Sequence, residues 1–274
     1  MHANGNGHRE VQRGKVQTNP VQAPSLLLLM LESGRAFSEY TTSVLSRPLW
    51  QQFPKGDGHP VMLLPGFLAS DFSTRPLRRF LRDQGYWAHP WRLGRNLGLR
   101  DQIEERILDR VRQLKRQHGR KVSLIGWSLG GIFAREIARK IPDEVRLVIT
   151  MGSPFGGWPK ANHSWRLFEW LSNKDVEVVS AERATVMHEP PPVPSTAIYS
   201  RTDGVTAWQS CLEKQSPTTE NVEVLASHLG FGFNPLTYYV IADRLAQDEN
   251  SWQPFEREGW LEYLYREPAE RPET

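Results

Sequence analysis

The stretch Gly126-Trp127-Ser128-Leu129-Gly130 places a serine between glycines, at the point where an apolar run gives way to a helical pattern. A hydroxyl at such a strand-to-helix corner projects above the sheet, where it can attack an electrophilic carbon. The glycines leave room for a tight turn, and the following helix N-terminus favours developing negative charge. We therefore predict that Ser128 is a nucleophile. A serine in an ordinary turn is the competing interpretation.

A serine hydroxyl needs a base that takes its proton and an acid that orients the base. Asp203 follows the apolar run 196–201, and His228 follows the run 221–227. The chain order Ser, Asp, His is the one that this strand–turn–helix architecture uses. The sequence thus predicts a triad of Ser128, His228 and Asp203. A turn-capping aspartate and a loop histidine bonded to the backbone are the alternative interpretations.

The other histidines fit the role of base less well because of their places in the chain. They are His2 and His8 in an amino-terminal tail, His59 before a strand, His89 within one, His118 at a helix end, and His163 and His188 in an insertion. Among the acids, Asp71 follows the first strand's loop and is a local competitor. Asp175 lies in a segment without a clear pattern.

Acyl transfer also needs two backbone N–H groups that point at the tetrahedral oxygen. Leu129, directly after the serine, is expected to supply one, and Phe67, after Pro-Gly, the other. An ordinary Pro-Gly turn is the alternative for the second position. In WRLGRNLG (91–98), Arg95 or Asn96 could orient this loop or bind a substrate head group. Capping of a glycine-rich turn explains these two residues equally well.

These side chains need a scaffold, and the chain's periodicity supplies one. The predicted strands are 61–64, 86–93, 121–126, 145–152, 196–201 and 221–227, and the predicted helices are 25–46, 73–85, 100–118, 129–140 and 235–246. Strands that read as apolar runs between helices indicate a mostly parallel sheet of about six strands with helices on both faces. Pro90 makes the second strand an edge strand or an irregular one.

The alternation breaks once, which indicates an insertion above the sheet. The predicted segments are a flexible tail (1–24), a helical segment (25–55), the first part of the core (56–152), a cap or lid (153–194), the second part of the core (195–248) and a carboxy-terminal extension (249–274). The cap is rich in aromatic residues. Together with one residue beside the serine, these give the pocket candidates Trp127, Phe155, Trp158, Trp165 and Phe168. Attachment of the cap to the body is the alternative role.

Composition excludes several other classes of protein. The chain of 274 residues is 39% apolar and 24% charged, which is typical of globular domains. Basic residues alternate with acidic ones and the formal charge is only +3, so no nucleic-acid surface is expected. A single cysteine, Cys211, excludes an internal disulfide and a cysteine-rich zinc site. Neither a metal nor an organic cofactor is expected.

The longest apolar run, LLLLML (26–31), is too short to span a bilayer and lacks a cleavage site for a secretory signal. We therefore expect no transmembrane segment and a cytoplasmic location. The helix 25–46 that contains this run has two interpretations. It either docks on the protein's own core or makes a weak contact with a membrane surface or a second copy of the chain.

Five segments in order, LLPGF, GWSLGG, ITMGSPFGG, SRTDGVT and ASHLGFG, resemble motifs of the α/β-hydrolase fold, and within it of bacterial lipases and esterases. The resemblance covers residues 60–246. It implies that Ser128 is the nucleophile, Asp203 the acid and His228 the base, with Phe67 and Leu129 as the oxyanion-hole residues.

The sequence departs from this family pattern at two positions. Pro65 stands where many relatives have a histidine, which affects the support of the loop more than its backbone donor. Trp127 replaces a more frequent histidine beside the nucleophile. The expected activity is hydrolysis of small or lipid-like carboxylic esters. Acyl transfer or thioester hydrolysis by the same triad is the alternative, and a non-catalytic hydrolase-like binding protein is a third interpretation.

Overall fold

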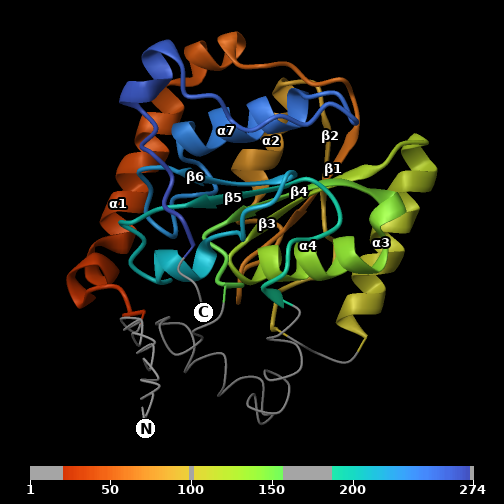
Figure 1. Ribbon diagram of the computed structural model, residues 1–274, viewed down its shortest axis with the longest axis horizontal. Coiled ribbons are helices and arrows are strands. Elements are labelled where there is room, and N and C mark those ends of the chain that lie inside the picture. Colours follow the sequence, from red (N-terminus) through yellow and green to blue (C-terminus); the bar gives the residue numbers. More distant parts are fainter. Residues whose placement is uncertain (1–20, 99–101, 157–186, 272–274) are drawn as a thin grey trace, which may run out of the picture.

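A sheet of six parallel strands lies at the centre of the computed structural model, which describes residues 21–98, 102–156 and 187–271 (Figure 1). The strands are β1 (Pro60–Leu64), β2 (Trp87–Pro90), β3 (Val122–Trp127), β4 (Val145–Met151), β5 (Ser195–Tyr199) and β6 (Thr219–Glu223). Their order across the sheet is β2-β1-β3-β4-β5-β6, with every neighbouring pair parallel. The predicted fold class is confirmed.

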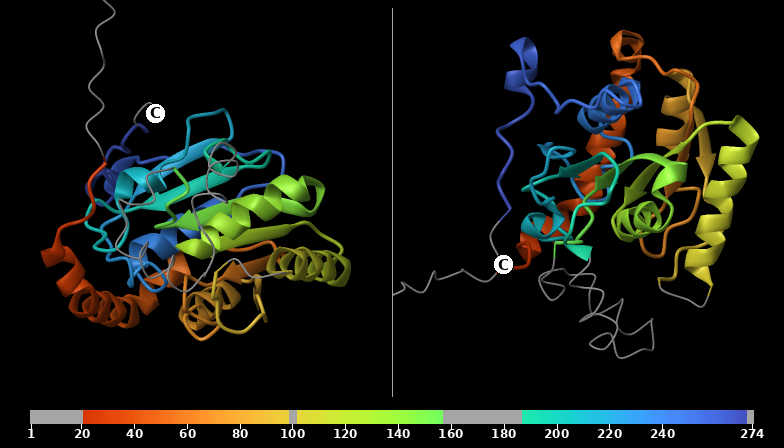
Figure 2. Two further views of the ribbon diagram at one scale, coloured as in Figure 1. Left: turned by 90° about the horizontal axis from the view of Figure 1, so that it is seen from below. Right: turned by 45° about the vertical axis from the view of Figure 1, so that its right-hand side comes forward.

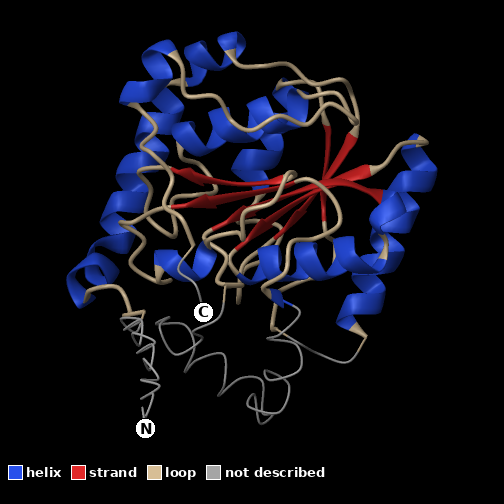
Figure 3. Cartoon of the chain, viewed as in Figure 1, coloured by secondary structure: helices blue, strands red, loops and turns tan. Residues whose placement is uncertain are grey.

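Helices cover both faces of this sheet (Figure 3). The longer helices are α1 (Leu26–Leu45), α2 (Arg75–Asp83), α3 (Ile103–His118), α4 (Leu129–Lys140) and α7 (Pro235–Ala246). Short 3₁₀ helices are η1 (Arg47–Gln52), η2 (Pro142–Glu144), η4 (Trp208–Cys211) and η5 (Gly259–Tyr263). Apolar side chains of α2 and α7 pack on one face of the sheet, and those of α3 and α4 on the other. The turned views show the same layers (Figure 2).

Strand β1 shows why the central strands read as unbroken apolar runs. Val61 and Leu63 point into the layer with α2 and α7, while Met62 and Leu64 point into the layer with α3 and α4. All four side chains are buried. Because successive residues of a strand point to opposite faces, a sheet that is covered on both sides needs apolar residues at every position. Each such burial stabilises the fold by roughly 1.5–3 kcal/mol.

Several predicted elements have nearly the bounds that the pattern indicated, and β2 is shorter than predicted. The helices expected at 129–140 and 235–246 are α4 and α7. Strand β2 lies at the edge of the sheet and ends at Pro90 rather than at residue 93. Beyond Pro90, the backbone N–H groups of Trp91 and Arg92 donate to the Asp71 carboxylate, and Arg92 has a φ of 61°. This side-chain bond turns the chain out of the sheet.

Strands β5 and β6 also end earlier than predicted, because the segments after them bond to each other through side chains. The hydroxyl of Ser200 donates to the carbonyl of Ala226 at 2.7 Å, and the N–H of Asp203 donates to the carbonyl of Ser200. Both segments therefore leave the hydrogen-bond ladder of the sheet and form loops at its carboxyl edge. We call residues 200–206 the acid loop and residues 224–230 the base loop.

The carboxy-terminal extension packs on the body. Tyr265 is buried in the layer with α7 and donates its hydroxyl to the carbonyl of Leu236 at 3.0 Å. Most of the predicted cap, residues 157–186, lies outside the described residues, and so do His163 and Asp175. Within the described ranges, no helix combines the length and the apolar character that crossing a membrane requires.

Candidate active site

The candidate catalytic residues follow three strands of the same sheet. Ser128 comes directly after β3, Asp203 lies in the acid loop after β5, and His228 lies in the base loop after β6. Because the strands are parallel, their carboxyl ends meet at one edge of the sheet, where ligands of α/β folds bind. The fold thus brings all three sequence-predicted residues to the same edge.

The backbone of Ser128 is held in a conformation that side chains rarely adopt, with φ 53° and ψ −121°. Its N–H donates to the carbonyl of Met151 in β4 at 2.8 Å, and its own carbonyl accepts from the N–H of Gly131 at 3.0 Å. Helix α4 begins at the next residue. A strained residue of this kind persists only where its surroundings fix it, which is typical of functional sites.

Glycines around Ser128 are required by close backbone packing. A Cβ atom at Gly126 would overlap the backbone of Gly131, and a Cβ atom at Gly130 would overlap the carbonyl of Leu64 in β1. The first turn of α4 therefore lies directly against β1 and β3. Replacing either glycine would push α4 away and relax the turn that presents the serine.

Asp203 and His228 form a short hydrogen bond. Nδ1 of His228 donates to Oδ2 of Asp203 at 2.6 Å. The aspartate also accepts from the N–H groups of Val205 and Thr206 and from the Thr206 hydroxyl, each at 2.7 Å. These donors fix the carboxylate, so Nδ1 of His228 carries the proton and Nε2 has a free lone pair.

The charge near His228 favours its protonated form. The imidazole is nearly inaccessible, and burial opposes protonation, but the charge and the hydrogen bond of Asp203, with the charge of Glu32, raise its pKa. A base that gains a proton during a reaction becomes an imidazolium, and a neighbouring carboxylate stabilises that ion. The pair can therefore accept a proton.

Trp127 ties the base loop to the strand that carries the serine. Its indole N–H donates to the carbonyl of His228 at 3.0 Å, and its side chain is 7% exposed. The ring packs in the apolar layer with α7. Next to it, a Cβ atom at Gly152 would lie 3.1 Å from both His228 Nδ1 and Asp203 Oδ2, so the end of β4 fits closely under the pair.

The loop after β1, residues 65–69, lies beside the serine and is fixed by Asn96. A Cβ atom at Gly66 would lie 3.4 Å from the Cβ of Ser128. Asn96 is only 1% exposed, and its side-chain N–H₂ group donates to the carbonyl of Pro65 at 2.8 Å. Its backbone carbonyl accepts from the N–H of Leu68 at 2.7 Å. Of the two predicted alternatives, Asn96 orients this loop, whereas Arg95 is exposed.

The competing acid and histidines are engaged elsewhere. Asp71 accepts the two N–H groups that end β2. His89 and His118 meet through their Nε2 atoms at 2.9 Å, and His188 contacts the carbonyl of Phe155. Burial lowers the pKa of each of these three histidines.

A second histidine cluster lies at the opposite, amino edge of the sheet. Nδ1 of His59 is 2.5 Å from Oδ1 of Asp57, and Nε2 of His59 is 2.8 Å from Oγ of Ser123. His59 and Ser123 are both completely buried. The sequence showed no signal for this cluster, because no glycine corner marks its residues and only folding brings the buried His59 and Ser123 together beside the exposed Asp57.

The two described pocket candidates are both buried. Phe155 is 1% exposed, and the guanidinium of Arg135 stacks on its ring at 3.8 Å from the centroid. A substrate-pocket role for Phe155 and Trp127 stays a prediction. The remaining pocket candidates lie outside the described residues: Trp158, Trp165 and Phe168.

Sequence reasoning missed several residues that hold the acid and base loops. They are Thr206 on the acid loop and Glu32, Arg35 and Glu39 on α1. A hydroxyl three residues after the aspartate is a weak local signal. The charged residues of α1 have none, because their partners lie far away along the chain.

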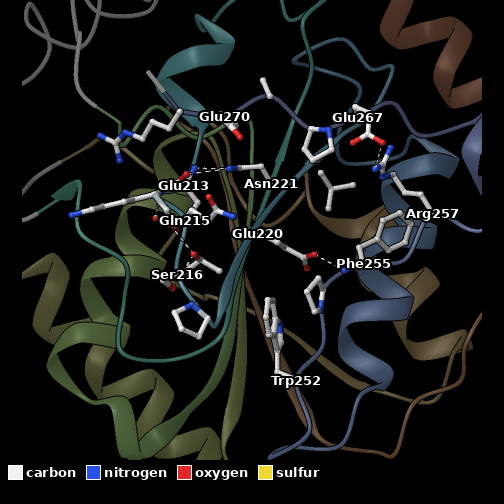
Figure 4. A pocket seen from close by; sticks show the side chains of 18 of the residues that line it. Glu213, Gln215, Ser216, Glu220, Asn221, Trp252, Phe255, Arg257, Glu267 and Glu270 are labelled. Carbon is white, nitrogen blue, oxygen red and sulfur yellow. Dashed lines mark hydrogen bonds and ion pairs between the residues drawn. The ribbon is translucent and has the colours of Figure 1, made fainter. Parts of the chain in front are cut away.

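A separate groove of about 980 Å³ lies between the edge strand β6 and the carboxy-terminal extension (Figure 4). Several of its charged side chains are engaged with one another or with the backbone. Glu220 accepts from the N–H of Phe255, and Arg257 pairs with Glu267, each at 2.6 Å. None of the three candidate catalytic residues lines this groove. Within the described part of the chain, no group of three or more candidate ligands could hold a metal ion.

The parallel sheet and the serine corner between β3 and α4 agree with the comparison of the sequence with known families. Residues 61–271 match the alpha/beta hydrolase family. The chain belongs to this family. The match covers the strands, the serine, the acid loop and the base loop. No curated protein matches the chain.

Solved structures show the same fold at low sequence identity. Aspergillus fumigatus lipase B has a TM-score of 0.53 and 19% identity, over 72% of this chain and 55% of that one. The mature Bacillus licheniformis lipase BlEst2 has a TM-score of 0.53 and 17% identity, over 70% and 94%. An alpha/beta superfamily hydrolase from Oenococcus oeni PSU-1 has a TM-score of 0.50 and 15% identity, over 72% and 94%. The chain thus spans just over half the length of the fungal lipase.

Proposed function

We propose that this alpha/beta hydrolase family member cleaves carboxylic esters through a triad of Ser128, His228 and Asp203. The hydrogen bond between Asp203 and His228, at the edge of the sheet where Ser128 adopts its strained conformation, is the observation that carries this proposal. Family membership supports a hydrolase, and the likeness to two lipases is consistent with an ester substrate.

In the proposed reaction, His228 first acts as a general base. Its Nδ1–H is held by Asp203, so Nε2 takes the proton from the Ser128 hydroxyl while Oγ attacks the ester carbonyl. The carbonyl π bond breaks, and its electron pair moves to the oxygen. The N–H groups of Phe67 and Leu129 then stabilise the oxyanion, in keeping with the loop that Asn96 holds beside the serine.

The tetrahedral intermediate collapses when the C–O bond to the alcohol breaks. The imidazolium of His228 gives its proton to the departing alkoxide, and the acyl group stays on Ser128. A water molecule then gives a proton to His228 and attacks the acyl carbonyl. The bond between the acyl carbon and Oγ of Ser128 breaks, and His228 returns the proton to Oγ, which releases the acid and restores the serine. Asp203 stabilises the imidazolium in both halves of the cycle, because its carboxylate accepts the Nδ1–H hydrogen bond of the ring.

Replacing the serine tests the proposal directly, and the chain offers a matched control. We expect Ser128→Ala to reduce kcat/KM for p-nitrophenyl acetate about 10⁴-fold or more and to abolish labelling by a fluorophosphonate. Ser123→Ala removes the serine that bonds to His59, outside the proposed machinery, and should keep both activities. Full hydrolysis by Ser128→Ala would overturn the proposal.

The acyl group and its acceptor need a second experiment. A series of p-nitrophenyl esters of increasing acyl length distinguishes an esterase from a lipase. Adding alcohols or amines and identifying the products by mass spectrometry distinguishes hydrolysis from acyl transfer. Assays with thioesters test thioester hydrolysis, the remaining alternative. The cytoplasmic location and the contact of residues 25–46 with a membrane surface or a second copy stay predictions.

A further inference from the structure

The charges of helix α1 all lie toward the candidate active site. The helix contains three charged residues, Glu32, Arg35 and Glu39, spaced three and four apart so that they share one face. Figure 1 shows α1 beside the ends of β5 and β6. Its other side carries exposed apolar side chains, namely Leu26, Leu27, Met30, Leu31, Phe37, Tyr40, Val44 and Leu45. Helix α1 thus turns its charged residues toward the protein and its apolar residues toward solvent, whereas an ordinary docked helix does the opposite.

Glu32 joins the acid loop to the base loop. Its Oε1 accepts from the N–H of Gly204 at 2.8 Å and from the N–H of His228 at 3.1 Å. Its Oε2 accepts from the N–H of Leu229 at 3.0 Å. Glu32 is only 3% exposed, so these charge-assisted bonds replace the water that the carboxylate loses on burial. A single side chain of α1 therefore bonds to both loops, in addition to the direct bond between Ser200 and Ala226.

Arg35 and Glu39 each hold one of these loops. Arg35 donates to the carbonyl of Thr202 at 2.5 Å and to its hydroxyl at 2.8 Å, both in the acid loop. Glu39 accepts from the N–H of Ser227 in the base loop at 2.7 Å and from the side-chain amide of Asn234 at 3.2 Å. These bonds anchor each loop to α1, but only Glu32 bonds to both.

Two glycines allow α1 to lie this close. A Cβ atom at Gly204 would lie 2.6 Å from the backbone carbonyl of Leu28, and a Cβ atom at Gly230 would overlap the Glu39 carboxylate. Gly204, directly after the acid, and Gly230, at the end of the base loop, are therefore needed for docking of the helix. This is a structural requirement that turn formation alone does not explain.

We propose that Glu32 is a positioning residue of the hydrolase, whose buried carboxylate fixes the loops of Asp203 and His228 relative to each other and holds a negative charge beside the imidazole. This inference rests on the proposed function for its effect on catalysis. Its effect on His228 itself can be measured without turnover.

The charged groups around His228 come from two elements. Asp203 of the acid loop and Glu32 of α1 both raise the pKa of His228 against the effect of burial. Arg35 lies 3.9 Å from Glu32 and partly offsets its charge, while Glu39 bonds one residue before His228. Cys211 of η4 is close to the acid loop, and burial raises the pKa of its thiol, which keeps it neutral.

Glu32→Gln keeps the size of the side chain and removes its charge, and Glu39→Gln on the same helix is the matched control. We expect Glu32→Gln to lower the pKa of His228, because a neighbouring negative charge is lost, and Glu39→Gln to leave it unchanged. Histidine NMR titration of the full chain measures this pKa, with His228→Gln identifying the signal. In the same variants, kcat for p-nitrophenyl acetate should fall 10–100-fold for Glu32→Gln, and the acid limb of kcat/KM should move to lower pH.

The outcomes separate this inference from the proposed function. A folded Glu32→Gln variant with the wild-type pKa for His228 would overturn the role of Glu32, whatever the protein hydrolyses. If wild type and Ser128→Ala hydrolyse esters equally, the proposed function fails while the titration still reports on Glu32. Should Glu32→Gln not fold, Glu32→Asp keeps the charge but shortens the reach to the three N–H groups. Wild-type kcat in that variant would then overturn the inference.

Discussion

The sheet holds two aspartate–histidine pairs, one at each edge. At the carboxyl edge, His228 donates to Asp203 at 2.6 Å. At the amino edge, His59 bonds to Asp57 at 2.5 Å and to Ser123 at 2.8 Å, so the geometry of a triad is complete there. Distances alone would favour the second cluster as the catalytic one.

The charges around the two pairs are opposite. Asp57 pairs with two arginines, Arg120 at 2.5 Å and Arg146 at 2.9 Å. Burial and the positive charge of Arg146 lower the pKa of His59 to about 4, so this imidazole stays neutral. Within the described residues no arginine or lysine pairs with Asp203, and Glu32 adds negative charge. A catalytic base needs surroundings that stabilise its cation, and of these two histidines His228 has them.

The two serines differ as well. Ser123 lies within β3 and is completely buried, whereas Ser128 is partly exposed on a strained corner that precedes a helix. A substrate carbonyl needs space beside the hydroxyl and N–H donors opposite it. The comparison teaches that hydrogen-bond geometry alone does not distinguish the two clusters, which differ in their charge and in their access to solvent.

The largest expected difference between the two edges appears in kcat/KM when each histidine is replaced by glutamine. We expect His228→Gln to reduce kcat/KM for p-nitrophenyl acetate about 10⁴-fold, because glutamine cannot act as a base. His59→Gln should leave kcat/KM within about threefold of wild type, because nothing at the amino edge touches the substrate in the proposed reaction. Comparable losses in both variants would contradict the distinction between the two edges.

The pH dependence of stability should separate the histidines by sign. The pKa of His59 is lowered from 6.5 to about 4, so its contribution is complete above pH 6.5 and is lost as the pH falls toward 4. This amounts to about 3 kcal/mol. Burial opposes protonation of His228, but Asp203 raises its pKa, so its contribution is complete below pH 6.5 and is lost as the pH rises through the folded-state pKa.

Urea unfolding of wild type, His59→Gln and His228→Gln from pH 4 to 9 measures these contributions. Relative to wild type, His59→Gln should flatten the free energy of unfolding on the acid side, and His228→Gln should flatten it on the alkaline side. If both substitutions flatten the free energy of unfolding on the same side of the pH range, the two imidazoles have similar surroundings.

The smallest expected effects are those of replacing Arg146 and Arg120, the two arginines that pair with Asp57. Arg146→Met should raise the pKa of His59, because a positive charge beside the ring disappears. Arg120→Met should raise it less, because Arg120 contributes less to lowering this pKa. Histidine NMR titration measures both, with His59→Gln identifying the signal. A larger increase in Arg120→Met than in Arg146→Met would argue against this account of the amino edge.

Much of the fold and part of the candidate site could be predicted from sequence, because the signals were local. Strict apolar runs gave the central strands, and 3.6-residue periodicity gave α4 and α7 with their observed bounds. The glycine-flanked corner at Ser128 was equally evident from the sequence, since a Cβ atom at Gly126 would overlap the nearby backbone of Gly131. The lengths of β2 and β6 were not readable, because side-chain bonds from distant loops end both strands.

The order of strands and helices and the corner that carries the serine follow from the sequence alone, because the forces involved act between near neighbours. Three further features arise only on folding. Glu32 bonds to a loop 196 residues away, Asn96 and not Arg95 holds the loop beside the serine, and His59 has surroundings unsuited to a base. These outcomes depend on burial and on charges brought together by folding. Such contacts leave no periodicity in the chain that a reader of the sequence could follow.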